Sequence, residues 1–180
     1  MNQLLTISNQ DFDPQAPQLD SAYFRERRAA RAVLLDSDGQ VYLINVSKHN
    51  YHKLPGGGID EGEEVKQALE RELMEEVGCK AEIIAELGQV VEFRGYKDDG
   101  LKQTSYCYLA KQLGEQGEAT LEDDELEKGM FAIKAKSIDH AIALVGRDQP
   151  GSLDEKFMQK RDLCFLKAAK SYVAAVAQQA

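Results

Sequence analysis

The chain has 180 residues, of which 43% are hydrophobic and 29% are charged, and its formal net charge is −9 at pH 7. The length suits one domain with a substantial core, and the composition is ordinary for a globular protein. The acidic balance argues against general affinity for nucleic acid, because no basic stripe is available to neutralise a phosphate backbone.

The cysteines and the first residues indicate the compartment. The three cysteines are widely separated and form no CxxC pair, which is typical of reduced thiols. The opening MNQLLTISNQDFDP lacks the basic and apolar regions of a signal peptide. No apolar run approaches the length of a membrane span. We therefore expect a cytoplasmic protein without membrane attachment.

The first half of the chain reads as strands joined by turns. Strand-like runs cover residues 4–7, 28–35 and 41–47. A turn through Pro14 and Pro17 follows the first run, and the Asp-Ser-Asp-Gly segment at residues 36–39 suits a hairpin between the second and the third. Next comes Pro-Gly-Gly-Gly at residues 55–58, which predicts a loop whose backbone closely approaches another group.

A helix is predicted over residues 63–77. Its apolar residues recur at helical spacing along one stripe: Val65, Ala68, Leu69, Leu73 and Val77. Acidic residues crowd its start, where the helix dipole favours anions. Gly78 stands where a helix commonly ends.

The second half of the chain predicts an antiparallel strand pair followed by helices. Residues 81–93 are β-prone with Gly88 as a bulge or bend, and a turn at residues 97–100 leads into a partner strand at 103–110. The remaining expectations are an acidic flexible loop at 115–127, a strand at 130–135, a helix capped by Ser137 and running to Val145, a break at 146–151, and an amphipathic helix at about 154–177.

Three carboxylates share one face of the predicted central helix. Glu72, Glu75 and Glu76 stand at i, i+3 and i+4, where like charges repel, and the last two also oppose the helix dipole. Each effect costs a few tenths of a kcal/mol to about 1 kcal/mol. A hard cation would reverse that cost, and clustered carboxylates suit Mg²⁺ or Mn²⁺. The alternative is a solvated acidic face with an ordinary Arg71–Glu75 pair.

These features form one motif. The segment from Gly57 to Cys79, GGIDEGEEVKQALERELMEEVGC, resembles a complete Nudix box, the signature of hydrolases that cleave diphosphate linkages with a divalent metal. Only Cys79 departs from it, at a position that usually takes an aliphatic residue, and a buried thiol behaves as a small hydrophobe. The resemblance implies an α/β fold, the α/β/α sandwich with a mixed sheet, and a looser similarity runs from about Arg28 to Ile142. We expect a single domain over residues 1–180, with the last helix as a C-terminal extension.

The resemblance also implies roles for the box residues. Glu72, Glu75 and Glu76 would be catalytic and would hold Mg²⁺, with Mn²⁺ as an alternative, and Arg71 and Glu63 would form a supporting ion pair. The family places one more catalytic carboxylate outside the box at no fixed spacing. The acidic segment offers several candidates, of which we favour Glu125 and expect most of the others to be solvated: Glu122, Asp123, Asp124 and Glu127.

Candidate substrate-binding residues surround the box. The backbone of Gly56, Gly57 and Gly58 would face the substrate. Tyr51 or His52 could stack on a base, although a packed loop aromatic is an equal alternative. Arginines near the strands could pair with phosphate oxygens or could be solvated strand charges: Arg28, Arg31 and Arg94. His49 and His140 carry no pattern.

The function that the resemblance implies is Mg²⁺-dependent hydrolysis of a nucleoside diphosphate linked to another moiety. The alternative is a catalytically idle fold of the same family that binds a nucleotide or sugar nucleotide as a sensor. We expect a small-molecule nucleotide as partner rather than a nucleic-acid polymer, since the net charge of −9 repels long phosphate chains. A homodimer is left open, and no downstream motif identifies the group attached to the diphosphate.

Overall fold

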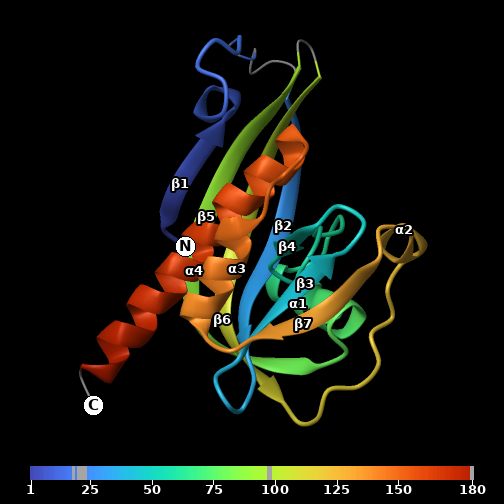
Figure 1. The fold of residues 1–180 in the computed structure, drawn as a ribbon, viewed down its shortest axis with the longest axis vertical. Helices are drawn as coiled ribbons and strands as arrows, with labels where there is room; N and C mark the ends of the chain where they lie inside the picture. The colour runs from blue at the N-terminus through green and yellow to red at the C-terminus, as the bar shows by residue number, and fades with distance from the viewer. Residues whose placement is uncertain (18, 20–23, 97–98, 179–180) are drawn as a thin grey trace.

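A mixed β-sheet is the centre of the fold in the computed structural model, which describes the chain except for residues 18, 20–23, 97–98 and 179–180. Within the described residues seven strands pair in the order β1-β5-β6-β2-β3-β4, with β7 on β3 (Figure 1). The strands are β1 (Gln3–Ser8), β2 (Phe24–Leu35), β3 (Val41–Val46), β4 (Tyr51–Lys53), β5 (Lys80–Tyr96), β6 (Asp99–Leu113) and β7 (Met130–Ala135). The β1–β5 and β2–β6 pairs are parallel and the others antiparallel.

Helices cover both faces of this sheet, as expected for an α/β/α sandwich. They are α1 (Val65–Glu76), the short α2 (Asp123–Glu127), α3 (Ile138–Arg147) and α4 (Leu153–Ala177), with a 3₁₀ turn η1 (Asn9–Asp11) after β1. Figure 1 shows α3 and α4 side by side on one face. None of the helices in the described part of the chain combines the length and apolar character needed to cross a bilayer.

Side-chain alternation along β2 creates two cores. Ala30, Ala32 and Leu34 point to the α1 side and pack with Leu69 and Leu73. Val33 points to the opposite face and joins a second core with residues of α3 and α4: Ala141, Val145, Phe157, Phe165 and Leu166. The last helix is therefore part of the sandwich rather than an appendage.

The glycine loop runs beside β2 and is held by backbone hydrogen bonds. Ala30 N–H donates to the Gly57 carbonyl at 3.0 Å, and Ile59 N–H donates to the Arg28 carbonyl at 3.0 Å. Gly56 has φ of +124°, and a Cβ there would collide with the carbonyl oxygen of Ala30. The close approach predicted from the glycines is thus an approach to β2.

Most predicted elements are present, including the bulge at Gly88, where the β5–β6 register shifts, and the cap of α3, where the Ser137 hydroxyl accepts from the His140 N–H. The 115–127 prediction was wrong in part, because α2 forms there and the Glu125 carboxylate accepts from the Glu122 N–H. The predicted break at 146–151 begins later, since α3 continues through Gly146 to Arg147. Residues 97 and 98 of the predicted turn lie outside the described residues.

Candidate active site

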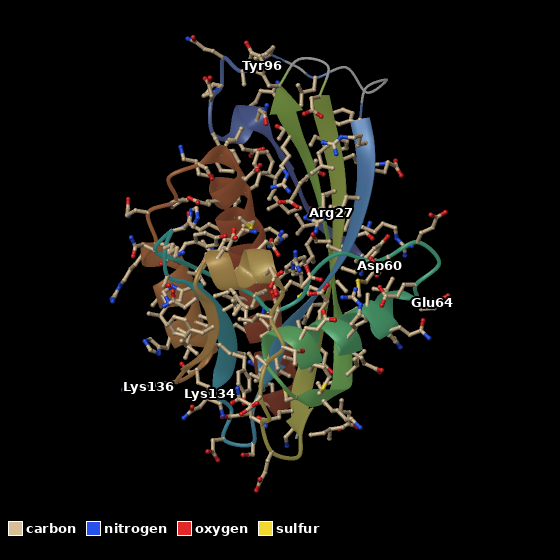
Figure 2. The ribbon with its side chains drawn as sticks, turned by 90° about the vertical axis from the view of Figure 1, so that its right-hand side faces the viewer. Arg27, Asp60, Glu64, Tyr96, Lys134 and Lys136 are labelled. Atoms are coloured by element: carbon tan, nitrogen blue, oxygen red, sulfur yellow. The ribbon has the colours of Figure 1, made fainter. Side chains whose placement is uncertain are left out.

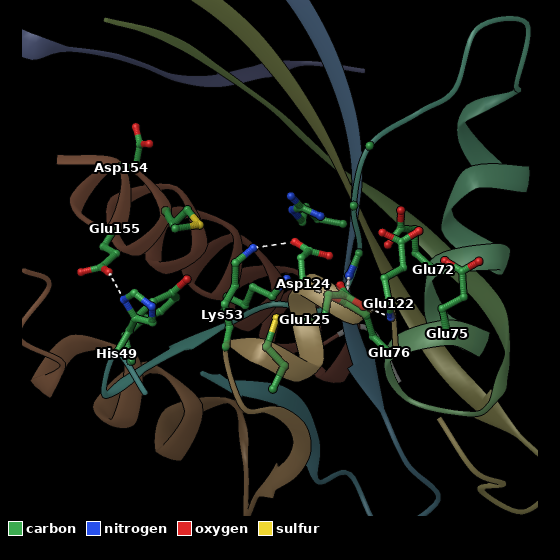
Figure 3. Close-up of a pocket in the computed structure, with 18 of the residues that line it drawn as sticks. His49, Lys53, Glu72, Glu75, Glu76, Glu122, Asp124, Glu125, Asp154 and Glu155 are labelled. Carbon is green, nitrogen blue, oxygen red and sulfur yellow. Dashed lines mark hydrogen bonds and ion pairs between the residues drawn. The ribbon is translucent and has the colours of Figure 1, made fainter. Parts of the chain in front are cut away.

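A cavity of about 410 Å³ opens between the glycine loop, α1, α2 and the first turns of α4 (Figure 3). Nine of the predicted site residues line it: Arg31, Tyr51, Gly56, Gly57, Gly58, Glu72, Glu75, Glu76 and Glu125. The fold therefore gathers residues from β2, the loop, α1 and α2 around one space. The roles of these residues remain predictions.

Glu76 is the most buried of the three box carboxylates, with 1% of the residue exposed. One of its oxygens accepts from the Gly56 N–H at 2.6 Å, and the other accepts from Lys53 Nζ at 2.8 Å. Lys53 was not among the sequence candidates, because a lone lysine before the glycine loop carries no pattern. Lys53 places a positive charge next to Glu76, which we expect to bind the metal.

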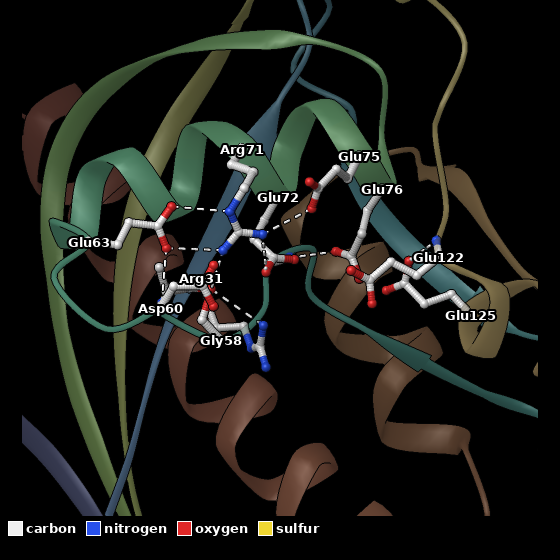
Figure 4. A network of polar contacts seen from close by, with 12 residues as sticks. Arg31, Gly58, Asp60, Glu63, Arg71, Glu72, Glu75, Glu76, Glu122 and Glu125 are labelled. Atoms are coloured by element: carbon white, nitrogen blue, oxygen red, sulfur yellow. Dashed lines mark hydrogen bonds and ion pairs between the residues drawn. The ribbon is translucent and has the colours of Figure 1, made fainter.

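Arg71 joins the other box residues into one network (Figure 4). It forms the expected ion pair with Glu63, with Nε and Oε1 3.1 Å apart, and its Nη1 donates to Glu72 and Glu75, both at 3.0 Å. Its Nη2 also donates to the Gly58 carbonyl at 3.0 Å. Arg71 thus ties α1 to the glycine loop, and the carboxylates expected to repel one another each have a cationic partner.

Two acidic side chains of the cavity, Glu72 and Glu125, lie in surroundings that favour their protonated form. Burial, with a smaller contribution from the nearby Glu76 charge, raises the pKa of Glu72 to about 7, against the effect of Arg71. Burial and, to a lesser extent, Glu76 also raise the pKa of Glu125. A cation placed among these oxygens would lower that electrostatic cost.

The donor set fits a hard divalent cation, although the described residues include no group of three acidic, His or Cys side chains already gathered as ligands. The reason lies in the contacts above, since Lys53 and Arg71 hold the carboxylates in ion pairs. Glu72, Glu75 and Glu76 all line the same cavity, and their oxygens are the ligand type that Mg²⁺ prefers. Binding would exchange ammonium and guanidinium contacts for the metal.

Two arginines of β2, Arg27 and Arg31, face the carboxylates across the cavity. Neither forms an ion pair with another described residue, and Arg31 Nε is buried with no hydrogen-bond partner among the described groups. Burial and the nearby Arg161 charge lower the pKa of Arg31 to about 10. Arg27 lies midway along the molecule on β2 (Figure 2). Sequence reasoning missed it because its neighbours in the run Arg-Glu-Arg-Arg look equally suitable.

The other predicted cations lie elsewhere. Arg94 does not line the cavity, because its guanidinium pairs with Asp154 at 3.3 Å and lies over the Phe157 ring. Arg28 instead stacks over the ring of Tyr106. In these positions neither Arg28 nor Arg94 reaches the cavity in which we expect the phosphates to bind.

Of the aromatic and histidine side chains near the glycine loop, some line the cavity and others do not. Tyr51 lines the cavity, and burial with the Glu155 charge raises its pKa to about 12. His52 does not line it and is bonded through Nδ1 to Asp148 at 3.0 Å. His49, which carries no pattern in the sequence, also lines the cavity and contacts Glu155 at 3.0 Å. The sequence does not show this position, because it depends on the packing of α4 beside β4.

Helix α4 supplies a wall of the site that the sequence did not predict. Ser152, Asp154, Glu155 and Met158 line the cavity opposite α1 (Figure 3). The helix begins with a capping box in which Ser152 Oγ accepts from the Glu155 N–H and the Glu155 carboxylate accepts from the Ser152 N–H. This cap could have been recognised in Ser-Leu-Asp-Glu, but its place beside the cavity could not.

Comparison with known proteins agrees with this geometry. A family model described as NUDIX domain matches residues 25–143, so the chain belongs to the Nudix family. An RNA pyrophosphohydrolase of Shewanella loihica (strain ATCC BAA-1088 / PV-4) is 30% identical over 132 residues, 73% of this chain and 68% of that protein. An RNA pyrophosphohydrolase of Wolbachia pipientis subsp. Culex pipiens (strain wPip) is 41% identical over 56 residues, 30% of this chain and 35% of that protein.

Solved structures support the fold. The crystal structure of the MutT NUDIX hydrolase from Burkholderia pseudomallei matches with a TM-score of 0.52 and 22% identity, covering 76% of this chain and 98% of that one. The chain spans less than half the length of several curated relatives that it matches. Both Cys164 and Arg161 of α4 lie beyond the residues that the family model matches.

Proposed function

We propose that this protein is a divalent-metal-dependent hydrolase that cleaves the diphosphate linkage of a nucleoside diphosphate attached to another group. The observation that supports this most is the opposition of charges across one cavity. Three carboxylates of α1 line one side, and Arg27 and Arg31, which have no carboxylate partner among the described residues, line the other. A metal and a diphosphate together would satisfy both sets.

Each side chain has a separate task in this proposal. Arg27 and Arg31 bind phosphate oxygens, as planar guanidinium groups do in two-point contacts. Gly56, Gly57 and Gly58 allow the backbone to lie close to the substrate. Glu72, Glu75 and Glu76 would hold Mg²⁺, or Mn²⁺ in its place, which when bound neutralises phosphate charge and lowers the pKa of a water.

Glu125 is the proposed carboxylate outside the box. Glu122, Asp124 and Glu125 all line the cavity, but Glu125 is partly buried whereas the other two are exposed and Asp124 pairs with Lys128 at 2.7 Å. The raised pKa of Glu125 suits a group that accepts a proton from water. Tyr51 is proposed to stack on the base or the attached group. We infer a cytoplasmic location from the unpaired cysteines, and a homodimer stays open.

The substrate is proposed to be a small nucleotide. A cavity of about 410 Å³ and a net charge of −9 favour it over a polymer. The names of the curated relatives, RNA pyrophosphohydrolase, make the triphosphorylated 5′ end of RNA the second candidate. A catalytically idle nucleotide-binding protein is the third, and the complete set of box carboxylates weighs against it.

A panel assay separates these candidates. The protein with Mg²⁺ is offered nucleoside diphosphate derivatives, dinucleoside polyphosphates, free triphosphates and a short 5′-triphosphorylated RNA, and the products are identified by mass spectrometry. Glu76→Gln serves as the control for contaminating activity. We expect metal-dependent cleavage of a small nucleotide. Preferred turnover of the RNA would select the second candidate, and tight binding without any turnover would select the third.

A further inference from the structure

Two opposite charges lie in the protein interior on α4, in a part of the chain that the family model does not match. Arg161 is 1% exposed and Asp162 is 0% exposed. Burying charge is costly even when the charges are paired, and apolar side chains often serve stability as well or better. A buried ion pair beside the cavity therefore calls for a role other than packing.

Asp162 contacts the strand end that leads into the glycine loop. Its Oδ2 accepts from the Leu54 N–H at 2.9 Å, and its Oδ1 accepts from Arg161 Nε at 2.8 Å. Two residues further along, the Gly56 N–H donates to Glu76. One α4 carboxylate thus fixes the backbone from which the loop reaches the box helix.

Arg161 connects the same pair to the arginines of the cavity. Its Nη1 lies 3.7 Å from Glu92 Oε2 on β5, and that oxygen accepts from Gln103 Nε2 on β6 at 2.7 Å. The amide oxygen of Gln103 in turn accepts from Arg27 Nη1 at 2.9 Å. The contacts run from α4 across β5 and β6 to a cavity-lining side chain on β2.

This chain of contacts leaves Gln103 with one available orientation. Its amide NH₂ faces the Glu92 carboxylate, so its oxygen must face Arg27. Glu92 and Gln103 are both 0% exposed, so bulk water does not compete for these contacts. Arg27 is held in place without a carboxylate, and its charge stays available to an anion.

We propose that Arg161 and Asp162 are positioning residues of the active site, which set the glycine loop and orient Arg27 toward the phosphates of the substrate. The proposal rests on the proposed function only in naming phosphates as the ligand. It gives α4 a role in substrate binding. The sequence does not indicate this role, because α4 lies far from the Nudix box along the chain.

The test measures binding of inorganic pyrophosphate by calorimetry, so that it requires no turnover. Asp162→Asn keeps an oxygen for Leu54 and removes the charge, and Gln103→Leu breaks the link between Glu92 and Arg27. Each is expected to weaken pyrophosphate binding about ten-fold.

Arg161→Lys, which keeps the charge, should retain more affinity for pyrophosphate than Arg161→Met. Phe165→Leu, a buried change on the same helix outside these contacts, should lower the melting temperature and leave the affinity unchanged.

A double-mutant cycle with Arg27→Met distinguishes positioning from stability. If Gln103 acts through Arg27, Gln103→Leu should cost no further affinity once Arg27 is absent. Additive losses, or variants that melt earlier yet bind pyrophosphate like the wild type, would overturn the proposal. Should Asp162→Asn not fold, Arg161→Lys against Arg161→Met tests the contribution of α4, and Gln103→Leu tests the link to Arg27. A wild type that binds pyrophosphate but hydrolyses nothing in the panel would refute the proposed function and leave this inference standing.

Discussion

The α1 side and the α4 side of the cavity hold their charges in opposite ways. On α1 the carboxylates lie within one stretch of sequence, and their partners, Lys53 and Arg71, are cations that a metal could displace. On α4 the charges of Arg161 and Asp162 are buried, and their partners come from residues as distant as Leu54 and Glu92. The groups expected to bind the ligand can be recognised from a local motif, whereas the groups proposed to hold them in place depend on the whole fold.

The two sides also differ in what offsets the loss of hydration of their charges. On the α1 side burial, with a smaller contribution from the Glu76 charge, raises the pKa of Glu72, and a bound cation would offset both effects. The α4 charges are unfavourable by loss of hydration, which the Arg161–Asp162 contact at 2.8 Å offsets. Metal binding should therefore stabilise the first side and leave the second largely unchanged.

The largest expected effect is on catalysis at the α1 side. Glu76→Gln should lower kcat by about 10²-fold or more, because it removes one charged contact to the metal or transition state. Steady-state kinetics at saturating Mg²⁺ measures it, and a melting curve checks the fold. Glu70→Gln, on the exposed side of α1, is the matched control and should keep the wild-type rate. Metal-free protein as active as the loaded enzyme would refute the role of the box.

The cavity arginines should show a smaller effect on affinity. Arg27→Ala is expected to raise KM for the nucleotide about ten-fold, as loss of a phosphate contact does. Arg94→Ala should raise KM less, since that guanidinium is occupied by Asp154. Initial rates across substrate concentrations give both values. A larger rise for Arg94→Ala than for Arg27→Ala would show that the cavity arginines have been misassigned.

The α4 cap gives a pH-dependent test. Burial tends to raise the pKa of Glu155, but the N–H groups of Ser152 and Gly151 and the ring of His49 outweigh it, so the pKa lies below 4.5. A depressed carboxyl pKa contributes stability above pH 4.5, which is lost as the pH falls through the folded-state value.

Glu155→Gln should accordingly lower the free energy of unfolding by about 1 kcal/mol at neutral pH. The difference from wild type should shrink as the pH falls below 4.5, and chemical denaturation at several pH values measures it. A difference that stays constant down to pH 3 would show that the carboxylate charge contributes nothing.

The smallest expected effect concerns Lys53. It forms an ion pair with Glu76 at 2.8 Å and would compete with a metal for that carboxylate. Lys53→Met should therefore tighten Mg²⁺ binding a few-fold, because Glu76 would no longer have to exchange an ammonium contact for the metal. Calorimetric titration of the metal-free protein measures this without turnover. Weaker Mg²⁺ binding in the variant would show that Lys53 supports the metal site instead of competing with it.

Sequence predicted the α1 side well because its signals are local. Helical period defines α1 over Val65–Glu76, and the spacing of Glu72, Glu75 and Glu76 alone puts them on one face. Most strands were also predicted, from β-prone runs and the turns between them, but the short β4 (Tyr51–Lys53) was not.

The rest of the site depends on long-range packing. Nothing local distinguishes Arg27 from its neighbours, since what selects it is Gln103, 76 positions away. The buried Arg161 and Asp162 look like surface charges of an amphipathic helix until β5 and β6 are placed beneath them. The same reason explains the unexpected place of His49, whose partner Glu155 is 106 positions away.

The most direct test of the account is Mg²⁺-induced stabilisation of the metal-free protein. A ligand that binds the folded state raises the melting temperature by mass action. The wild type should melt at progressively higher temperature as Mg²⁺ is added, and the triple variant E72Q/E75Q/E76Q should show no such rise. Equal responses of the two proteins would contradict the account, because the three carboxylates would then not be the metal ligands.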